Sequence, residues 1–103
     1  MNKQQVQLVR EGKTLHLHGQ INFQTVNALY RLLTQELVIG TTMLDCSKVD
    51  QCDSSAISLL LASRRLALGR QISLQIHGMN EQMVSLARLY DVETVLQSEK
   101  VAN

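Results

Sequence analysis

The segment TMLDCSKVDQCDSSAISLLL (residues 42–61) changes character twice, from an apolar stretch through a polar one into a leucine-rich one. Its first part, Thr42 to Ser47, is typical of a short strand. The following residues, KVDQCD, are polar and predict a loop. Asp53 or Ser54 stands where a helix N-cap is expected, because both side chains accept hydrogen bonds from unpaired backbone N–H groups. A helix is therefore predicted from this point to Gly69.

Two alternating runs precede this segment and predict a β-hairpin. VQLVR (residues 6–10) and TLHLHG (residues 14–19) each alternate apolar and polar residues, and the turn Glu-Gly-Lys separates them. The two leucines of the second run are expected to face one side of the strand, and His16 and His18 the other.

Two helices are predicted from apolar residues that recur at helical spacing. The first begins near Val26 and is expected to end by Gly40. The second is the helix that follows the polar stretch, and its central apolar positions are Ile57, Leu60, Leu61 and Leu68.

The remaining residues predict a strand and a third helix. The run ISLQIH (residues 72–77) alternates like a strand. Asn80 is the expected N-cap of the next helix, since an apolar residue before it and another four residues after it fit a hydrophobic staple. Val95 and Leu96 either add a last short strand or close the core.

These elements define the predicted fold class, which is α/β with the order β-β-α-β-α-β-α. The opening hairpin is antiparallel and the strands on either side of the second helix are parallel, so the sheet is mixed. We expect about four to five strands covered by about three α-helices. The chain has 103 residues, of which 45% are hydrophobic, and it is expected to form a single domain spanning residues 1–103.

Composition and charge exclude several classes of protein. The net charge of +1 argues against a nucleic-acid-binding protein, which would usually show a basic stripe. No run reaches the roughly 18 apolar residues that a membrane span needs, and the first residues lack the apolar core of a signal peptide. We therefore expect a cytoplasmic protein without direct membrane insertion. Cys46 and Cys52 have no metal-binding spacing and are interpreted as ordinary thiols.

Motifs for catalysis and cofactor binding are missing from the sequence. A hydrolase nucleophile would lie in G-x-S-x-G, whereas the serines here lie in C-D-S-S-A. The 5 glycines are scattered and form neither a Walker loop nor a dinucleotide-binding loop. His16 and His18 could converge on one strand face, but a third metal ligand would have to come from elsewhere. We expect no catalytic residue, no metal and no cofactor, and we interpret both histidines as polar residues of an exposed strand face.

The stretch Asp53-Ser54-Ser55 is the candidate functional site. Its simplest role is capping, which is worth about 1 kcal/mol. It also offers more capping groups than one helix end requires, and it follows a strand at the carboxyl edge of the predicted parallel pair, where α/β folds place functional loops. Phosphorylation of a hydroxyl here would add a charge of roughly −1.5 to −2. Capping and partner docking are compatible roles for the same atoms.

The strand, the Asp-Ser pair and the leucine-rich helix together resemble the STAS domain, a family named after sulfate transporters and anti-sigma factor antagonists. Asp53 and Ser54 occupy the family's D-[S/T] positions. The resemblance extends from LHLHGQIN (residues 15–22) to the last predicted helix. Its most specific part is GMNEQMVSLARLYDV (residues 78–92), which is similar to the small STAS subunits of Mla-type phospholipid-transport ABC complexes.

This resemblance implies a non-catalytic subunit. Such subunits bind the ATPase of an inner-membrane ABC complex, and through it the permease, and they support the assembly and activity of the complex. The complex moves phospholipid between the two membranes of Gram-negative bacteria and maintains outer-membrane lipid asymmetry. The expected location is cytoplasmic and peripheral on the inner membrane, held there by the partner.

The resemblance also implies roles for individual residues. Ser54 would be the hydroxyl that contacts the ATPase, with Asp53 and Ser55 flanking the contact. The alternative is an anti-sigma factor antagonist, a phosphorylatable partner switch in which Ser54 would be the phosphoacceptor. Such antagonists commonly carry D-S-S-G, whereas Ala56 follows the serines here.

Overall fold

A computed structural model describes residues 6–97 of the protein, and strands and helices alternate along most of this range. The element order agrees with the sequence prediction up to the third helix, and a fourth helix follows it. The elements are β1 (Val6–Glu11), β2 (Thr14–Ile21), α1 (Val26–Glu36), β3 (Met43–Cys52), α2 (Ser54–Gly69), β4 (Gln75–His77), α3 (Glu81–Leu89) and α4 (Glu93–Gln97).

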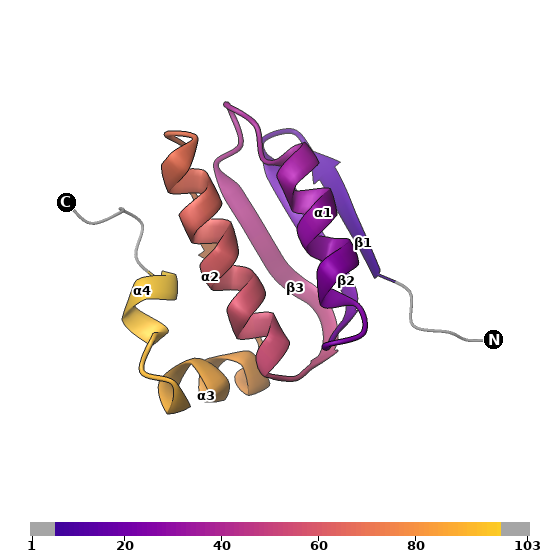
Figure 1. The fold of residues 1–103 in the computed structure, drawn as a ribbon, viewed down its shortest axis with the longest axis vertical. Coiled ribbons are helices and arrows are strands. Elements are labelled where there is room, and N and C mark those ends of the chain that lie inside the picture. Colours follow the sequence, from indigo (N-terminus) through magenta and orange to yellow (C-terminus); the bar gives the residue numbers. More distant parts are fainter. Residues whose placement is uncertain (1–5, 98–103) are drawn as a thin grey trace.

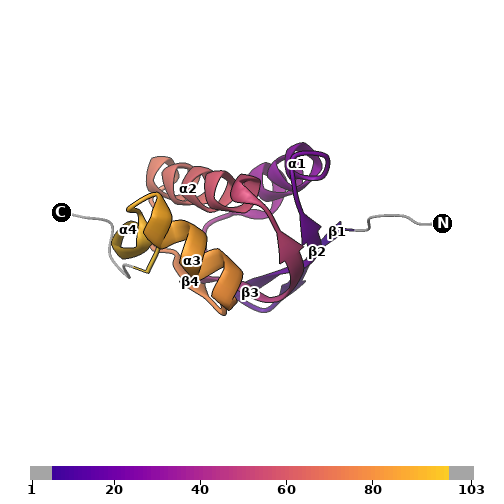
Figure 2. The same ribbon diagram turned by 90° about the horizontal axis from the view of Figure 1, so that it is seen from below.

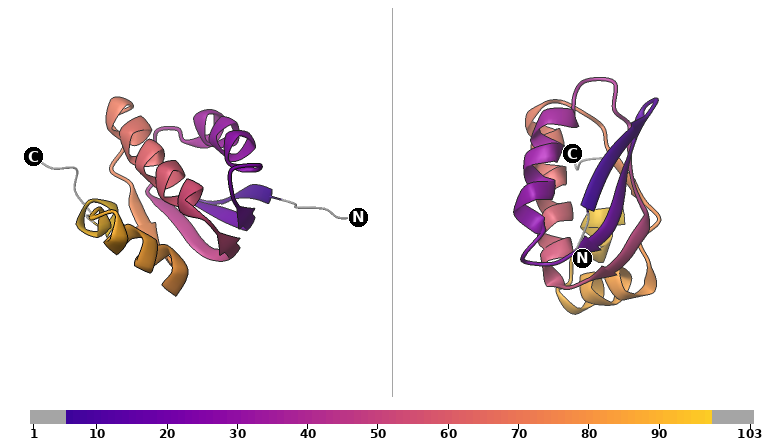
Figure 3. Two further views of the ribbon diagram at one scale, coloured as in Figure 1. Left: turned by 60° about the horizontal axis from the view of Figure 1, so that its bottom comes forward. Right: turned by 90° about the vertical axis from the view of Figure 1, so that its right-hand side faces the viewer.

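The strands form one four-stranded mixed sheet in the order β1-β2-β3-β4. β1 and β2 pair antiparallel, whereas β2 with β3 and β3 with β4 pair parallel. α1 and α2 lie side by side over one face of the sheet (Figure 1), and α3 and α4 lie near β4 (Figure 2). The side view in Figure 3 shows the helix layer on one side of the strands. The predicted α/β class and mixed sheet are confirmed.

The core lies between the sheet and the α1–α2 layer and is aliphatic. Leu15 and Leu17 of β2 are 0% exposed, which confirms the predicted faces of this strand. Burial of one such side chain is worth about 1.5–3 kcal/mol, so α2 is held to the sheet chiefly by its apolar face. The buried apolar residues of α2 are Ala56, Ile57, Leu59, Leu60 and Ala67.

The predicted change from strand to loop in the 42–53 segment is wrong, because β3 continues to Cys52. Its register against β2 shifts twice, and at each shift two steps along β2 face three along β3. Each shift is a β-bulge, which adds one residue to the strand and reverses the face of those that follow. The buried positions of β3 therefore lie at uneven spacing, at Leu44, Cys46, Val49 and Cys52.

The strand predicted over residues 72–77 is shorter in the structure, because β4 begins at Gln75 and only its three residues within this run pair with β3. The backbone N–H of Ile72 donates instead to the carbonyl of Ala67 at 2.8 Å, which folds this residue back against the end of α2. Ile72 and Leu74 are nevertheless buried. These two apolar residues of the run therefore pack in the core without pairing in the sheet.

The predictions for the remaining helical residues are partly right. Asn80 caps α3 as predicted, since its Oδ1 accepts a hydrogen bond from the backbone N–H of Met83 at 2.8 Å. Leu68 is not a central apolar position, because it is 54% exposed near the end of α2. Val95 and Leu96 belong to α4 and not to a strand, and of the two only Leu96 is buried.

Arg64 of α2 is a charged residue of the core with an exposure of 9%. Its guanidinium donates hydrogen bonds to the carbonyl oxygens of Leu74 and Leu96. Burial lowers the pKa of Arg64 below its ordinary value. These bonds tie α2 to the segment before β4 and to α4.

Candidate functional site

The predicted site Asp53-Ser54-Ser55 lies where β3 ends and α2 begins, at the lower end of α2 in Figure 1. Asp53 has an extended backbone, with φ −115° and ψ −166°, and its Oδ1 accepts a hydrogen bond from the backbone N–H of Ser55 at 2.8 Å. Asp53 is therefore the N-cap, one of the two residues predicted for that role. Ser54 is the first residue of the helix.

The side chain of Asp53 also connects α2 to the turn between β2 and α1. Its Oδ2 accepts a hydrogen bond from the backbone N–H of Phe23 at 3.3 Å. The backbone N–H of Asp53 donates to the carbonyl of Ile21 at 3.0 Å. One residue thus holds the starting points of α1 and α2 in a fixed relation.

The turn between β2 and α1 is itself closed by side-chain hydrogen bonds. Oδ1 of Asn22 accepts from the backbone N–H groups of Gln24 at 2.9 Å and Thr25 at 3.2 Å. The hydroxyl of Thr25 accepts from the backbone N–H of Asn22 at 3.0 Å and donates to the carbonyl of Gln20 at 2.8 Å. Bonds of this kind stabilise turns by satisfying backbone groups locally. The turn presents Phe23, whose exposure is 74%, to solvent.

An open hollow of about 310 Å³ lies beside the start of α2. Its wall includes Gln82 of α3, whose Oε1 accepts a hydrogen bond from the backbone N–H of Cys52 at 3.3 Å. Carboxamide side chains dominate the lining, and each offers both donors and an acceptor. The lining residues are Gln20, Ile21, Asn22, Gln51, Cys52, Asp53 and Gln82. We call the hollow together with Phe23, Asp53, Ser54 and Ser55 the α2 tip.

The hydroxyl groups of the two serines of the α2 tip take no part in the cap. Ser54 is exposed and Ser55 is half-buried. Within residues 6–97, neither hydroxyl makes a hydrogen bond with another residue. The helix dipole adds a partial positive charge at this end of α2. The hydroxyls are therefore able to donate to, and accept from, a surface placed on the tip.

The cysteines near this site are buried, free thiols. Burial raises the pKa of Cys46 to about 12, and burial together with the nearby Asp53 charge raises the pKa of Cys52. Both thiols are thus protonated at neutral pH, and a protonated thiol is a poor nucleophile and metal ligand.

Residues 6–97 contain neither a metal-binding cluster nor a membrane-spanning helix. Among residues 6–97, no group of three or more His, Cys, Asp or Glu side chains could hold a metal ion. No helix in the same range combines the length and the apolar character that crossing a bilayer requires. The chemistry that the α2 tip does offer is hydrogen bonding and apolar contact.

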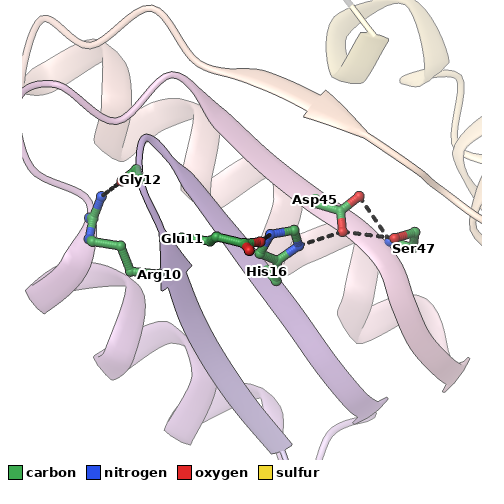
Figure 4. Close-up of polar contacts among 6 residues, drawn as sticks. All are labelled: Arg10, Glu11, Gly12, His16, Asp45 and Ser47. Carbon is green, nitrogen blue, oxygen red and sulfur yellow. Dashed lines mark hydrogen bonds and ion pairs between the residues drawn. The ribbon is translucent and has the colours of Figure 1, made fainter.

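His16 lies on the outer face of the sheet between two carboxylates (Figure 4). Its Nδ1 lies 2.8 Å from Oδ2 of Asp45, and its Nε2 lies 3.0 Å from Oε1 of Glu11. The hydroxyl of Ser47 donates to the same Asp45 oxygen at 2.8 Å. This network joins β1, β2 and β3, so His16 has a structural role beyond that of an exposed polar residue.

Asp45→Asn is expected to lower the free energy of unfolding at pH 7 by about 1.5 kcal/mol. Burial alone would raise the pKa of Asp45, but the hydrogen bonds with His16 and Ser47 outweigh it and lower the pKa below 3.8. A lowered pKa in the folded state stabilises the fold above the unfolded-state pKa, and this stabilisation is lost as the pH falls through the folded-state value. Urea unfolding at several pH values measures the effect.

The difference between wild type and Asp45→Asn should therefore shrink below about pH 4. Asp50→Asn is the matched control, because Asp50 is an exposed aspartate of the same strand. A destabilisation by Asp45→Asn that stays constant down to about pH 3 would show that the charge of Asp45 does not stabilise the network.

Comparison with known proteins agrees with this fold. The model of the family described as "Mlab, STAS domain" matches residues 4–98, so the chain belongs to the STAS domain family. It is also similar to the "Intermembrane phospholipid transport system binding protein MlaB" of Escherichia coli (strain K12) and to the protein of the same name from Shigella flexneri. Each is 30% identical over 84 residues, which cover 82% of this chain and 86% of the relative.

Proposed function

We propose that the chain is a non-catalytic accessory subunit of an Mla-type phospholipid-transport ABC complex and binds its ATPase subunit through the α2 tip. The observation that carries the proposal is the similarity, over 84 residues, to two proteins named as binding proteins of an intermembrane phospholipid transport system. The chain acts as one STAS domain, residues 1–103, in the cytoplasm, and it reaches the inner membrane and the permease through its partner. Its binding supports assembly and activity of the complex, which thereby maintains outer-membrane lipid asymmetry.

The geometry of the α2 tip supports docking at this place. Asp53 and the closed turn before α1 hold the backbone of the tip, so binding needs little additional ordering of the chain. The exposed hydroxyl of Ser54 and the carboxamides of the hollow offer polar contacts beside the apolar ring of Phe23. Apolar contact with a polar surround is the usual composition of a protein interface.

The surroundings of Ser54 contain features for and against the alternative function, that of an anti-sigma factor antagonist. A phosphate on Ser54 would lie at the positive end of the α2 dipole, which favours the added charge of about −2. The same phosphate would lie next to the carboxylate of Asp53, which opposes it. The side chain of Ala56, at the position where antagonists commonly carry glycine, is fully buried.

The proposal is tested by affinity purification of the tagged chain from extracts of its native membranes, with mass spectrometry of the proteins that accompany it. We expect an ABC ATPase and its permease, because the subunit reaches the membrane through them. An extract from an untagged strain is the control. Recovery of a kinase-type anti-sigma factor, or of Ser54 carrying phosphate, would replace the transport proposal with the signalling alternative.

A further inference from the structure

We propose that Phe23 is the apolar anchor with which the α2 tip binds its partner, and that the ATPase subunit provides an apolar recess beside its contact with Ser54. The inference rests on the proposed function. It adds Phe23 to the residues of the Asp-Ser motif, and it requires an apolar recess on the partner. Phe23 lies outside the stretch that the sequence marks as the site.

The first observation is the exposure of this side chain. Phe23 is the single phenylalanine of the chain, and 74% of it is exposed. Aromatic rings contribute strongly to binding when they enter a pocket, because they bury a large apolar area with few rotatable bonds. An exposed aromatic residue next to a polar docking site is therefore well suited to be its energetic centre.

The second observation is the rigid support of Phe23. Its backbone N–H donates to Asp53, the residue that caps α2. The hydrogen bonds of Asn22 and Thr25 close the turn on either side. The backbone of Phe23 is thus held by Asp53, the residue that also caps the helix starting at Ser54, so the proposed contacts at Ser54 and Phe23 share one framework. A side chain on a fixed backbone costs less entropy to immobilise on binding.

The third observation separates Phe23 from other exposed apolar residues. Ile39 is 85% exposed and Leu89 is 73% exposed. Ile39 lies in the connection between α1 and β3, at the end of the helix layer opposite the start of α2 (Figure 1). Leu89 is the last residue of α3. Within residues 6–97, neither forms a hydrogen bond with Asp53, whereas the backbone N–H of Phe23 does, and its neighbour Asn22 lines the carboxamide hollow.

The experiment compares binding of Phe23→Ala and Ile39→Ala to the purified ATPase subunit by isothermal titration calorimetry. We expect Phe23→Ala to raise the Kd by about 30-fold or more, as for a central aromatic contact. Ile39→Ala should stay within about 2-fold of wild type, because scattered surface apolar residues contribute little to binding. Phe23→Leu retains an apolar side chain and should recover part of the loss. The Tm of each variant reports its folding.

The outcomes separate this inference from the proposed function. If Phe23→Ala binds like wild type while Ser54→Arg prevents binding, the tip is the interface but Phe23 is not its anchor. If Ile39→Ala weakens binding as much as Phe23→Ala, the interface is not centred on the α2 tip and the inference fails. If the wild-type chain does not bind the ATPase subunit at all, the proposed function and the inference fail together.

Discussion

Gly78→Ala is expected to lower the free energy of unfolding by about 3 kcal/mol. Gly78 has a φ of +78°, and an added Cβ would lie 2.8 Å from Oδ1 of Asp45 and 2.8 Å from the backbone N of Ser47. The positive φ alone costs an alanine about 1 kcal/mol. The contact adds a larger cost, because the Ser47 backbone belongs to β3, an interior strand of the sheet, and overpacking typically costs about 1–3 kcal/mol.

Gly12→Ala is the matched control for this prediction. Gly12 has a φ of +63°, but a Cβ added there would have no atom within 4 Å. It should therefore show only the conformational cost of about 1 kcal/mol. Urea unfolding followed by circular dichroism gives the change in the free energy of unfolding for both variants. It is the shift in the urea midpoint multiplied by a common m-value. Equal losses for the two variants would contradict the close approach of Gly78 to β3.

The hairpin and the starts of α2 and α3 are predictable because their signals are local. Leu15 and Leu17 alternate with polar residues along a strand that has one buried face. Asp53 and Asn80 each cap the helix predicted to follow them. In these elements the intrinsic preferences of the residues agree with the tertiary structure.

The extension of β3 is not predictable in the same way, because its bulges depend on pairing. An alternation test assumes that every second residue of a strand is buried. From Cys46 onward the buried residues of β3 are three apart, at Val49 and Cys52, so the polar residues between them look like a loop. The pairing register with β2 is what identifies these residues as a strand.

The candidate site is only partly predictable from the sequence, because part of it depends on contacts between residues far apart in the chain. Asp53, Ser54 and Ser55 are marked by a motif and by their place before a leucine-rich helix. The position of Phe23 depends on a hydrogen bond to a residue 30 positions away, which no local pattern contains. The signal that was present is a single aromatic residue among polar neighbours in I-N-F-Q-T, between a predicted strand and a predicted helix. Arg64 is similar, since only the fold distinguishes it from the exposed Arg65.

Ser54→Arg is expected to raise the Kd for the ATPase subunit by about 100-fold, equivalent to about 2.8 kcal/mol. A long charged side chain on the first residue of α2 would separate the two surfaces and leave a charge buried between them. The effect on folding should be small, because Asp53 supplies the cap and a positive charge at a helix start costs about 0.3–1 kcal/mol. Ser54→Ala should leave stability nearly unchanged for the same reason.

Calorimetric titration of the purified ATPase subunit with wild type, Ser54→Arg and Ser73→Arg tests the docking of the α2 tip most directly. Ser73 is an exposed serine beyond the far end of α2, so its substitution adds the same side chain away from the tip. We expect binding by wild type and Ser73→Arg within about 2-fold of each other, and a loss of about 100-fold for Ser54→Arg at a similar Tm. If folded Ser54→Arg binds as tightly as wild type, the α2 tip is not the surface that meets the ATPase.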